Sequence, residues 1–346
     1  MDDELRRMLA AKAAGVDVNQ TMPPSIRSRV RRRRARLMTT VVAITAMVAV
    51  SAVAIGGQLT ERRVKPAPSV SPAPNDFDIY TMATDGSNVI RVTEDPRNES
   101  QPAWSPDGKH LAFTRYEDGG SSHIYVTVPG RPERPLTRGR AIDQAPAWSP
   151  DGRYIAFTRT AGVGAAPRIF LIDLRKQHSA PKQLIEHVAT SSEAWPSWSP
   201  DGKHIAFVGN DSTIFRFDFA DGSVTPLVKS QGGFGKTVWG PNGFLSGFIA
   251  TTVFNEDDDV YLVSDDGSGL HRLTDIPDAP DGYPTWSPDG TTIAFMTVAE
   301  NGTDEIYTIS AISGGGETDR LTDNKVDDGL PAWSPNGKRI AFASNR

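Results

Sequence analysis

A five-residue pattern that begins with Trp recurs along this chain of 346 residues. It reads Trp, Ser or Gly, Pro, Asp or Asn, Gly, and it starts at Trp104, Trp148, Trp198, Trp239, Trp286 and Trp333. Successive copies begin about 40 to 50 residues apart, which is the period of architectures built from four-stranded units. Every copy carries several turn residues, so a helical solenoid is disfavoured. The chain is therefore expected to fold as a series of small β-sheets.

The residues of each copy indicate a tight turn between two strands. Pro fixes φ at one turn position, Asp or Asn can bond its own backbone, and Gly accepts positive φ. An apolar run follows the turn, then a third strand such as 123–126 and a shorter, more polar fourth strand such as 134–137. Such a fourth strand suits the solvent edge of a sheet. The repeated Trp is expected to fill the wedge between neighbouring sheets.

The two ends of the repeat region complement each other. The last copy supplies only two strands, whereas two strand-like segments, 77–82 and 89–93, precede the first copy. Pairing these segments with the C-terminal strands would complete one sheet and close the ring. The sequence thus predicts an all-β fold, a six-bladed β-propeller with N- and C-terminal strand closure, over residues 76–346.

The repeats resemble the TolB-type, WD-like propeller repeat of bacterial envelope proteins. The resemblance extends over roughly residues 76–346 and rests on the repeated Trp, Pro, Asp and Gly positions. Members of the family include periplasmic binding proteins, domains attached to peptidases, and unattached sensors. The resemblance implies architecture more strongly than chemistry, as is general for widely reused folds.

The N-terminal quarter of the chain predicts a membrane anchor. Residues 37–56 contain no charged residue, and about 20 such residues span a bilayer core. The preceding tail, 1–36, is rich in Arg, which favours a cytoplasmic N-terminus. A Pro-rich spacer, 57–75, follows. We expect a single-pass cell-membrane protein with one transmembrane helix and an extracytoplasmic propeller; a cleaved export signal with 52–54 as its cleavage site is the alternative.

Composition argues against several functions. Without cysteine, neither disulfides nor Cys-ligated metals stabilise the fold. The net charge is −5 although the tail is basic, so the exported part is acidic and a nucleic-acid partner is disfavoured. Motif searches find no Gly-x-Ser-x-Gly elbow, His-Glu-x-x-His motif or phosphate loop. We expect a protein that is not an enzyme and that has no cofactor and no metal site.

One repeated feature suggests a ligand site. Five residues before the repeated Trp stand Glu99, Asp143, Glu193, Phe234, Asp281 and Asp328. If this segment forms the innermost strand, as the resemblance implies, its carboxylates would ring one mouth of the central channel and attract cations or basic segments. Alternatively, each carboxylate bonds nearby backbone N–H groups and fixes its own loop.

Three aromatic side chains complete the predicted ligand-binding set. Phe234 interrupts the row of carboxylates, and an irregular repeat often marks a site. Trp195 and Tyr283 are expected near the same mouth, where they could stack on a ligand. Packing in the core or at the rim is the alternative for both.

The sequence therefore predicts a membrane-anchored binding or sensing module. Its expected partner is an extracytoplasmic protein, a peptide or a cell-wall glycan. One alternative is a transmembrane regulator similar to an anti-sigma factor, whose tail binds a cytoplasmic regulator. Others are a metal-dependent lyase or hydrolase with its site in the channel, and a purely structural envelope component.

Overall fold

The computed structural model describes residues 76–346 except 163, 177–178, 187–189, 211, 243–244, 255–257 and 277–278. These residues belong to one compact unit, Met47–Arg346. The predicted tail, transmembrane span and spacer lie outside the described residues. Within the described part of the chain, no helix is long and apolar enough to cross a membrane.

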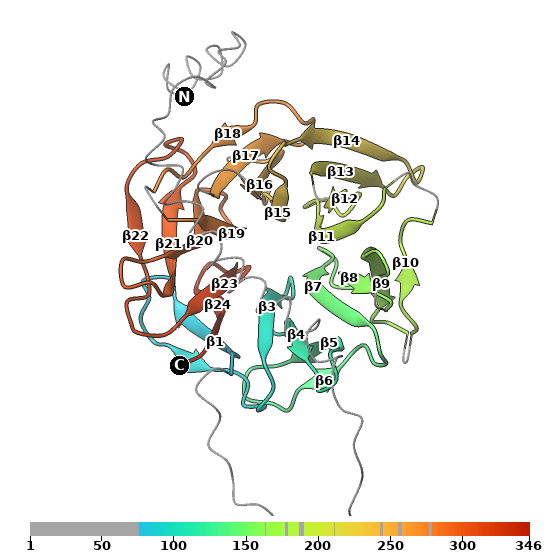
Figure 1. Ribbon diagram of the computed structural model, residues 1–346, viewed down its shortest axis with the longest axis horizontal. Coiled ribbons are helices and arrows are strands. Elements are labelled where there is room, and N and C mark those ends of the chain that lie inside the picture. Colours follow the sequence, from blue (N-terminus) through green and yellow to red (C-terminus); the bar gives the residue numbers. More distant parts are fainter. Residues whose placement is uncertain are drawn as a thin grey trace, which may run out of the picture. The chain divides into compact units, whose positions relative to one another are not determined.

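The described residues form 24 strands and confirm the predicted all-β fold. Antiparallel pairing groups the strands in fours, and the groups are arranged around a centre that the first strand of each group surrounds (Figure 1). These innermost strands are β3 (Glu99–Trp104), β7 (Ile142–Trp148), β11 (Glu193–Trp198), β15 (Phe234–Trp239), β19 (Asp281–Trp286) and β23 (Asp328–Trp333). Each ends at the repeated Trp.

The other strands follow outward in each group. The second strands are β4 (Leu111–Tyr116), β8 (Tyr154–Thr160), β12 (His204–Gly209), β16 (Phe248–Val253), β20 (Thr292–Val298) and β24 (Arg339–Ser344). The third strands are β5 (Ser122–Thr127), β9 (Arg168–Asp173), β13 (Thr213–Asp218), β17 (Asp259–Ser264), β21 (Asp304–Ser310) and β1 (Asp78–Ala83). The fourth strands are β6 (Arg134–Pro135), β10 (Lys182–Gln183), β14 (Val224–Lys229), β18 (His271–Arg272), β22 (Thr318–Arg320) and β2 (Ile90–Arg91).

The two ends of the described chain meet in one sheet. Its strand order is β2-β1-β24-β23, and β1 pairs with β24 from Asp78 opposite Ser344 to Ala83 opposite Arg339. The hydroxyl of Tyr80 also donates to the carbonyl of Arg346 at 3.0 Å. The predicted pairing of N- and C-terminal strands is confirmed, and it ties the first described strand to the last.

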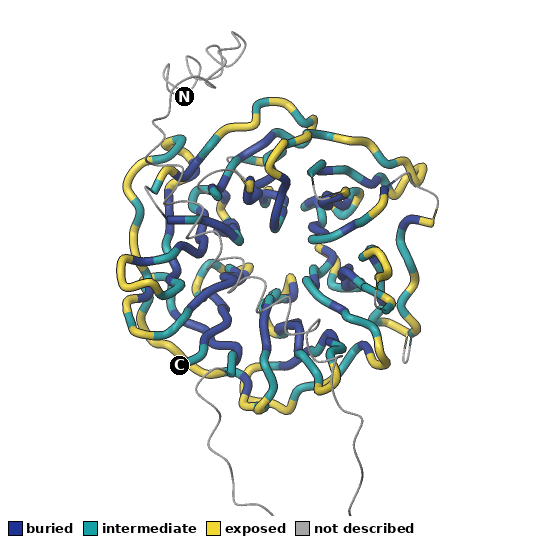
Figure 2. The backbone as a smooth tube through the Cα atoms, viewed as in Figure 1, coloured by how far each residue is buried: buried dark blue, intermediate teal, exposed yellow. Residues whose placement is uncertain are grey.

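Apolar side chains between neighbouring sheets form the core. One Phe on the second strand is fully buried in five of the groups: Phe113, Phe157, Phe207, Phe295 and Phe342. In Figure 2 the buried backbone lies within and between the sheets, while exposed residues follow the outer edge. Five of the six outermost strands have only two or three residues, for example Ile90–Arg91, which is exposed as expected for an unpaired sheet edge; β14, with six residues, is the exception.

The repeated Trp residues join neighbouring sheets. Trp148 Nε1 donates to the carbonyl of Ala103 at 3.1 Å, and Trp198 and Trp286 bond the preceding innermost strand in the same way. The second residue after the turn Gly contacts the next Trp in three copies: Tyr154 and His204 stack on Trp198 and Trp239, and the ring of His110 lies tilted at 40° to Trp148 with centroids 6.3 Å apart. The predicted wedge role of Trp is confirmed, and this His has a packing role.

In five of the six copies, all but the one that begins at Trp239, the turn after Trp is held by its own side chains. In the second copy, Ser149 Oγ donates to Asp151 Oδ1 at 2.6 Å. Asp151 Oδ1 also accepts from the backbone N–H of Arg153 at 3.0 Å. The bond from Ser149 is the main cause that lowers the pKa of Asp151. Tyr154 N donates to Ser149 Oγ at 2.8 Å and starts the next strand. Turn chemistry thus fixes where the second strand begins.

Candidate functional site

Each innermost strand carries a β-bulge at the same place. In β3 the register with β4 shifts between Ser100 and Ala103, and equivalent shifts occur in the other five innermost strands. The residue within the bulge stands three positions before the repeated Trp. It has φ between 53° and 56° in five of the strands, at Gln101, Ala145, Trp195, Tyr283 and Leu330. This region costs a non-Gly residue about 1–2 kcal/mol, so the surrounding sheet must hold it.

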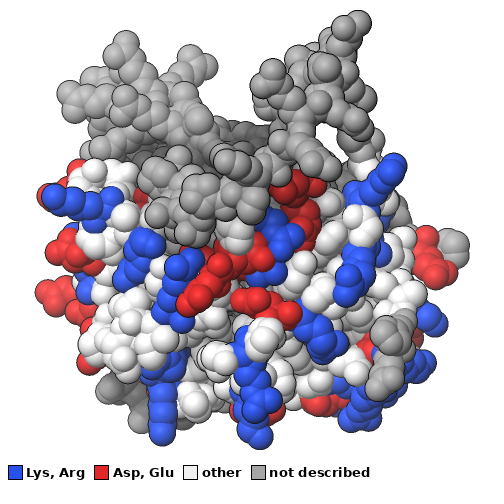
Figure 3. Space-filling model, turned by 90° about the horizontal axis from the view of Figure 1, so that it is seen from below, with Lys and Arg blue, Asp and Glu red and all other residues white. Residues whose placement is uncertain are grey.

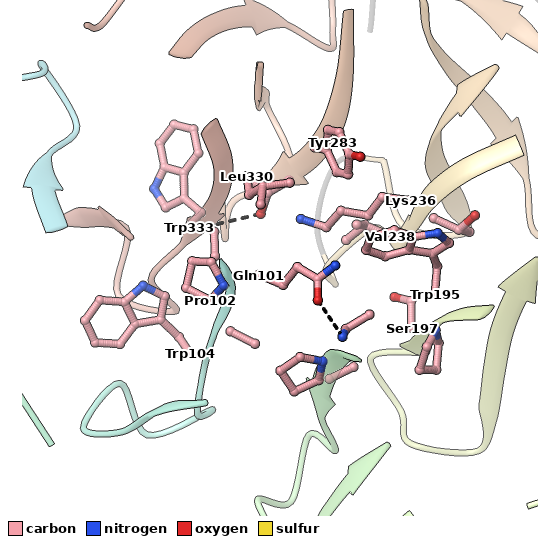
Figure 4. A pocket seen from close by; sticks show the side chains of 18 residues that line it. Gln101, Pro102, Trp104, Trp195, Ser197, Lys236, Val238, Tyr283, Leu330 and Trp333 are labelled. Atoms are coloured by element: carbon pink, nitrogen blue, oxygen red, sulfur yellow. Dashed lines mark hydrogen bonds between the residues drawn. The ribbon is translucent and has the colours of Figure 1, made fainter. Parts of the chain in front are cut away.

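These bulge residues surround a cavity of about 190 Å³ at the centre of the ring. The sixth position is Lys236 of β15, which lies in the same cavity (Figure 4). The cavity therefore takes one variable side chain from every group of strands. The φ angle at the site is nearly constant in five of the six strands, while the six side chains differ in size and chemistry.

Aromatic groups line part of this cavity. Trp195 and Tyr283 meet edge to face, with ring centroids 5.8 Å apart and planes at 71°. Their backbone N–H groups are held by the hydroxyls of Thr158 and Thr252, at 3.2 and 3.1 Å. Burial raises the pKa of Tyr283, so its hydroxyl stays protonated and can donate a hydrogen bond. The structure thus places both predicted aromatic residues in the channel lining.

Lys236 brings a cation into this lining. Its Nζ donates to the carbonyl of Pro331, on β23, at 3.2 Å. The residue is half-buried, because solvent in the channel reaches it although protein surrounds it. Burial lowers its pKa to about 8, and no neighbouring charge contributes to that shift. Near neutral pH the amine is mostly protonated, and it forms no ion pair with a carboxylate of the described chain.

The five predicted carboxylates lie elsewhere. Each begins or nearly begins its innermost strand, yet all five are at most 1% exposed: Glu99, Asp143, Glu193, Asp281 and Asp328. This corrects the expectation of an exposed acidic rim at the channel mouth. The carboxylates are turned into the protein, where they contact basic side chains and backbone.

Asp143 and Glu193 show which contacts these carboxylates make. Arg159 donates to Asp143 Oδ1 and Oδ2 at 2.6 and 2.8 Å, which is a two-point ion pair. Glu193 accepts from Arg168 at 3.0 Å and from the backbone N–H of Ile169 at 3.1 Å. These bonds link the start of an innermost strand to its own or the preceding sheet. The geometry favours the alternative in which the acid fixes its local chain.

Two further acids are paired in the same manner. Glu99 contacts Arg115, and Asp328 contacts Arg346 and also accepts from Asn324 at 2.6 Å. Burial is the main influence on Glu99 and raises its pKa to about 7, although the Arg115 guanidinium opposes this.

Asp281 differs from the other four acids because no Arg or Lys among the described residues forms an ion pair with it. Burial raises its pKa to about 7, and the hydroxyls of Thr297 and Thr274 offset this only in part. Arg272 is nearby but pairs with Asp259 at 2.9 Å. Asp281 therefore titrates close to neutral pH.

Phe234 occupies the position of the missing acid and is 3% exposed. It packs in an apolar cluster with Val208, Trp239 and Val253. Since Val253 is its cross-strand partner, no basic side chain stands opposite it. Phe234 is thus part of the core between sheets, and the structure does not bring it into the cavity.

Sequence reasoning missed Lys236 and Gln101 in the cavity. The repeated carboxylate five positions before Trp drew attention because it is conserved among the copies. The residue three positions before Trp differs in every copy. This variation at a fixed distance from an invariant Trp is the sequence feature that could have identified the cavity lining. The bulge that turns this residue into the channel could not be derived from alternation of polar and apolar residues.

The described residues contain no group of three or more His, Asp or Glu side chains placed to hold a metal ion. On the face shown in Figure 3, acidic and basic side chains are interspersed. That part of the surface offers no large field of one sign to steer a charged partner.

Comparison with known proteins agrees with the geometry. A family described as the TolB beta propeller domain matches residues 64–275. The Tol-Pal system protein TolB of Desulfosudis oleivorans is 38% identical over 58 residues, which is 17% of this chain and 13% of that protein. The match spans only this small part of the curated relative, so the activity of the whole relative does not transfer.

Solved structures give the same architecture. A putative TolB from Agrobacterium tumefaciens aligns with a TM-score of 0.64 and 21% identity over 78% of this chain and 97% of that chain. An oligogalacturonate lyase in complex with manganese aligns with a TM-score of 0.51 and 15% identity over 78% and 95%. At such identities the likeness shows the fold alone. Because the family match covers more than half of the sequence, the chain belongs to the TolB beta-propeller domain family.

Proposed function

We propose that this protein is a binding module of the bacterial cell envelope that recognises an extracytoplasmic protein or peptide at its central channel. The observation that carries the proposal is the set of six bulge residues, which differ in every strand although all six stand at the same place in a repeated framework of strands. Rigid scaffolds that present variable side chains at one place are typical of recognition sites. Family membership supports protein binding in the envelope.

The proposal includes the membrane anchor expected from residues 37–56. An apolar segment of this length with Arg before it supports a single span that keeps a six-bladed propeller outside the cytoplasm. Sensing through tail 1–36 is a second candidate. It is supported by the short tail on the opposite side of the predicted span.

Position-specific photocross-linking in intact cells tests the proposal. A photoreactive residue at Ala145, which is small and lines the cavity, should capture a discrete envelope partner. The same residue at Gly222, on an outer turn where no atom lies within 4 Å of an added Cβ, is the matched control. Equal capture at both positions, or none at Ala145, would remove the channel from the proposal.

Metal analysis of the purified full-length protein separates the binding module from a lyase or hydrolase. A metal-dependent enzyme should retain one ion per chain after exhaustive dialysis. We expect no stoichiometric ion, and finding one would favour the catalytic alternative.

A further inference from the structure

Lys236 is a cation in the lining of the central cavity, and no described carboxylate forms an ion pair with it. Its hydrogen bond to the carbonyl of Pro331 uses one of the three N–H donors of the ammonium group. By contrast, the buried acids Asp143 and Glu193 are paired with Arg159 and Arg168. Taking a charge out of water without a partner is unfavourable, so a buried or half-buried ammonium of this kind is suited to an incoming anion.

Gln101 adds a second donor beside this cation. Its Oε1 accepts from Thr114 Oγ1 at 2.9 Å and from the backbone N–H of Ala145 at 2.8 Å. An oxygen that accepts from a backbone N–H fixes the orientation of the amide, so the Nε2 group is left to face the cavity. Figure 4 shows the Lys236 amine and the Gln101 amide directed toward the same central space.

Aromatic and aliphatic side chains form another part of the cavity lining. Trp195 and Tyr283 form an aromatic wall, and Leu330 adds an aliphatic side chain from β23. A cavity of about 190 Å³ admits a side chain or a chain end but no folded domain. The site therefore combines one cation, one amide donor and an aromatic wall in a small volume.

We propose that the channel binds a carboxylate group of a peptide segment, with Lys236 and Gln101 holding the carboxylate and Trp195 and Tyr283 packing against an adjacent apolar side chain. The inference rests on the proposed function and specifies the chemistry of the partner. A single ammonium balances the single charge of a carboxylate, whereas phosphate groups are usually met by clusters of Arg. The carboxylate comes from a C-terminus or from an Asp or Glu side chain.

Calorimetric titration of the full-length protein at pH 6.5 with matched peptides tests the inference. The probes are acetyl-Gly-Gly-Phe with a free C-terminal carboxylate, its C-terminal amide, and acetyl-Gly-Phe-Glu amide. We expect at least one carboxylate probe to bind about tenfold more tightly than the uncharged amide. The free-terminus probe alone would identify a chain end, and the Glu probe alone a side chain.

Lys236→Met should abolish this preference, so that charged and uncharged probes bind equally. Lys203→Met, which removes a lysine whose side chain is 75% exposed, should leave the preference unchanged. Thermal unfolding of both variants verifies that they are folded. Equal binding of all probes to the wild-type protein, or a preference that survives Lys236→Met, would overturn the inference.

The same variants keep this inference separate from the proposed function. If Ala145-directed capture of an envelope partner persists while the probes show no carboxylate preference, only the carboxylate assignment fails. If capture also fails, the channel as a recognition site fails with it.

Discussion

Strands β7 and β15 occupy the same place in two groups of the ring, yet they use it differently. β7 carries Asp143, which is bound to Arg159, and its bulge residue Ala145 has φ 53°. β15 has Phe234 in place of the acid and Lys236, without positive φ, in the bulge. The comparison teaches that the position five residues before the repeated Trp holds the framework together, while the position three residues before it is free to change the channel.

The largest effect is expected when β15 receives the acid that it lacks. Phe234→Asp would bury a carboxylate opposite Val253, where no Arg is available, and would remove a buried aromatic ring. We expect unfolding free energy to fall by about 4 kcal/mol or more in urea titrations. Phe234→Leu, the apolar control, should cost roughly 1 kcal/mol.

Adding the missing partner sharpens this test. The double variant Phe234→Asp with Val253→Arg reproduces the cross-strand arrangement of Asp143 and Arg159. It should be more stable than Phe234→Asp alone by about 1 kcal/mol or more. No recovery would contradict the view that Asp143, like Glu99, is fixed by its cross-strand Arg.

Removal of the acid from a regular strand should cost somewhat less. Asp143→Asn leaves the Arg159 guanidinium facing a neutral amide in a buried site. The expected loss is about 3 kcal/mol in the same urea titrations, because the unpaired charge stays inside the protein. A loss below about 0.5 kcal/mol, as is usual for exposed ion pairs, would show that the pair is not part of the framework.

Asp281 should behave in the opposite way because no Arg or Lys of the described residues pairs with it. Its pKa of about 7 lies above the ordinary value of 3.8, so the folded protein binds the proton more tightly than the unfolded chain. This contribution to stability is present at low pH and is lost as pH rises through 7. Asp281→Asn should therefore stabilise the protein by roughly 2 kcal/mol at pH 8 and leave it unchanged near pH 4.

Thermal unfolding at both pH values measures this difference. Arg272 and Asp259, whose charges also influence the pKa of Asp281, are unaltered in the variant. A destabilised variant at pH 8 would mean that the charged Asp281 has a partner in the folded protein.

The smallest effect concerns the bulge itself. Ala145 has φ 53°, so Ala145→Gly should relieve backbone strain and raise stability by about 0.5 kcal/mol after the entropy of Gly is counted. Lys236 has no positive φ, and Lys236→Gly should lower stability instead. Calorimetry measures the change in stability of each variant. A change of the same sign in both variants would contradict the difference in bulge geometry between β7 and β15.

Much of the fold could be predicted from the sequence because it rests on local chemistry. The Trp and the Pro-Asp-Gly turns recur, and each turn is closed by side chains within it, such as Ser149 and Asp151. Strand closure between β1 and β24 followed from the unmatched strands at the two ends. The sequence pattern alone predicts these features, without information on which distant residues are in contact.

The candidate site was harder to predict. Whether Asp143 faces solvent or Arg159 depends on cross-strand register, which a repeat pattern does not contain. The position of Lys236 in the channel depends on a bulge that shifts one residue to the other face of the strand. Trp195 and Tyr283 were identified because their size stood out, whereas Gln101 had no distinctive chemistry in the sequence.

Paired measurements on Asp143→Asn and Lys236→Met test the central division between framework and recognition most directly. For each variant, unfolding free energy and the affinity for the carboxylate-bearing peptide are measured under conditions where the protein is folded. The account predicts that Asp143→Asn loses about 3 kcal/mol of stability but keeps its affinity within roughly twofold, while Lys236→Met keeps its stability and loses the carboxylate preference. Loss of affinity in Asp143→Asn with unchanged stability, together with full affinity in Lys236→Met, would contradict it.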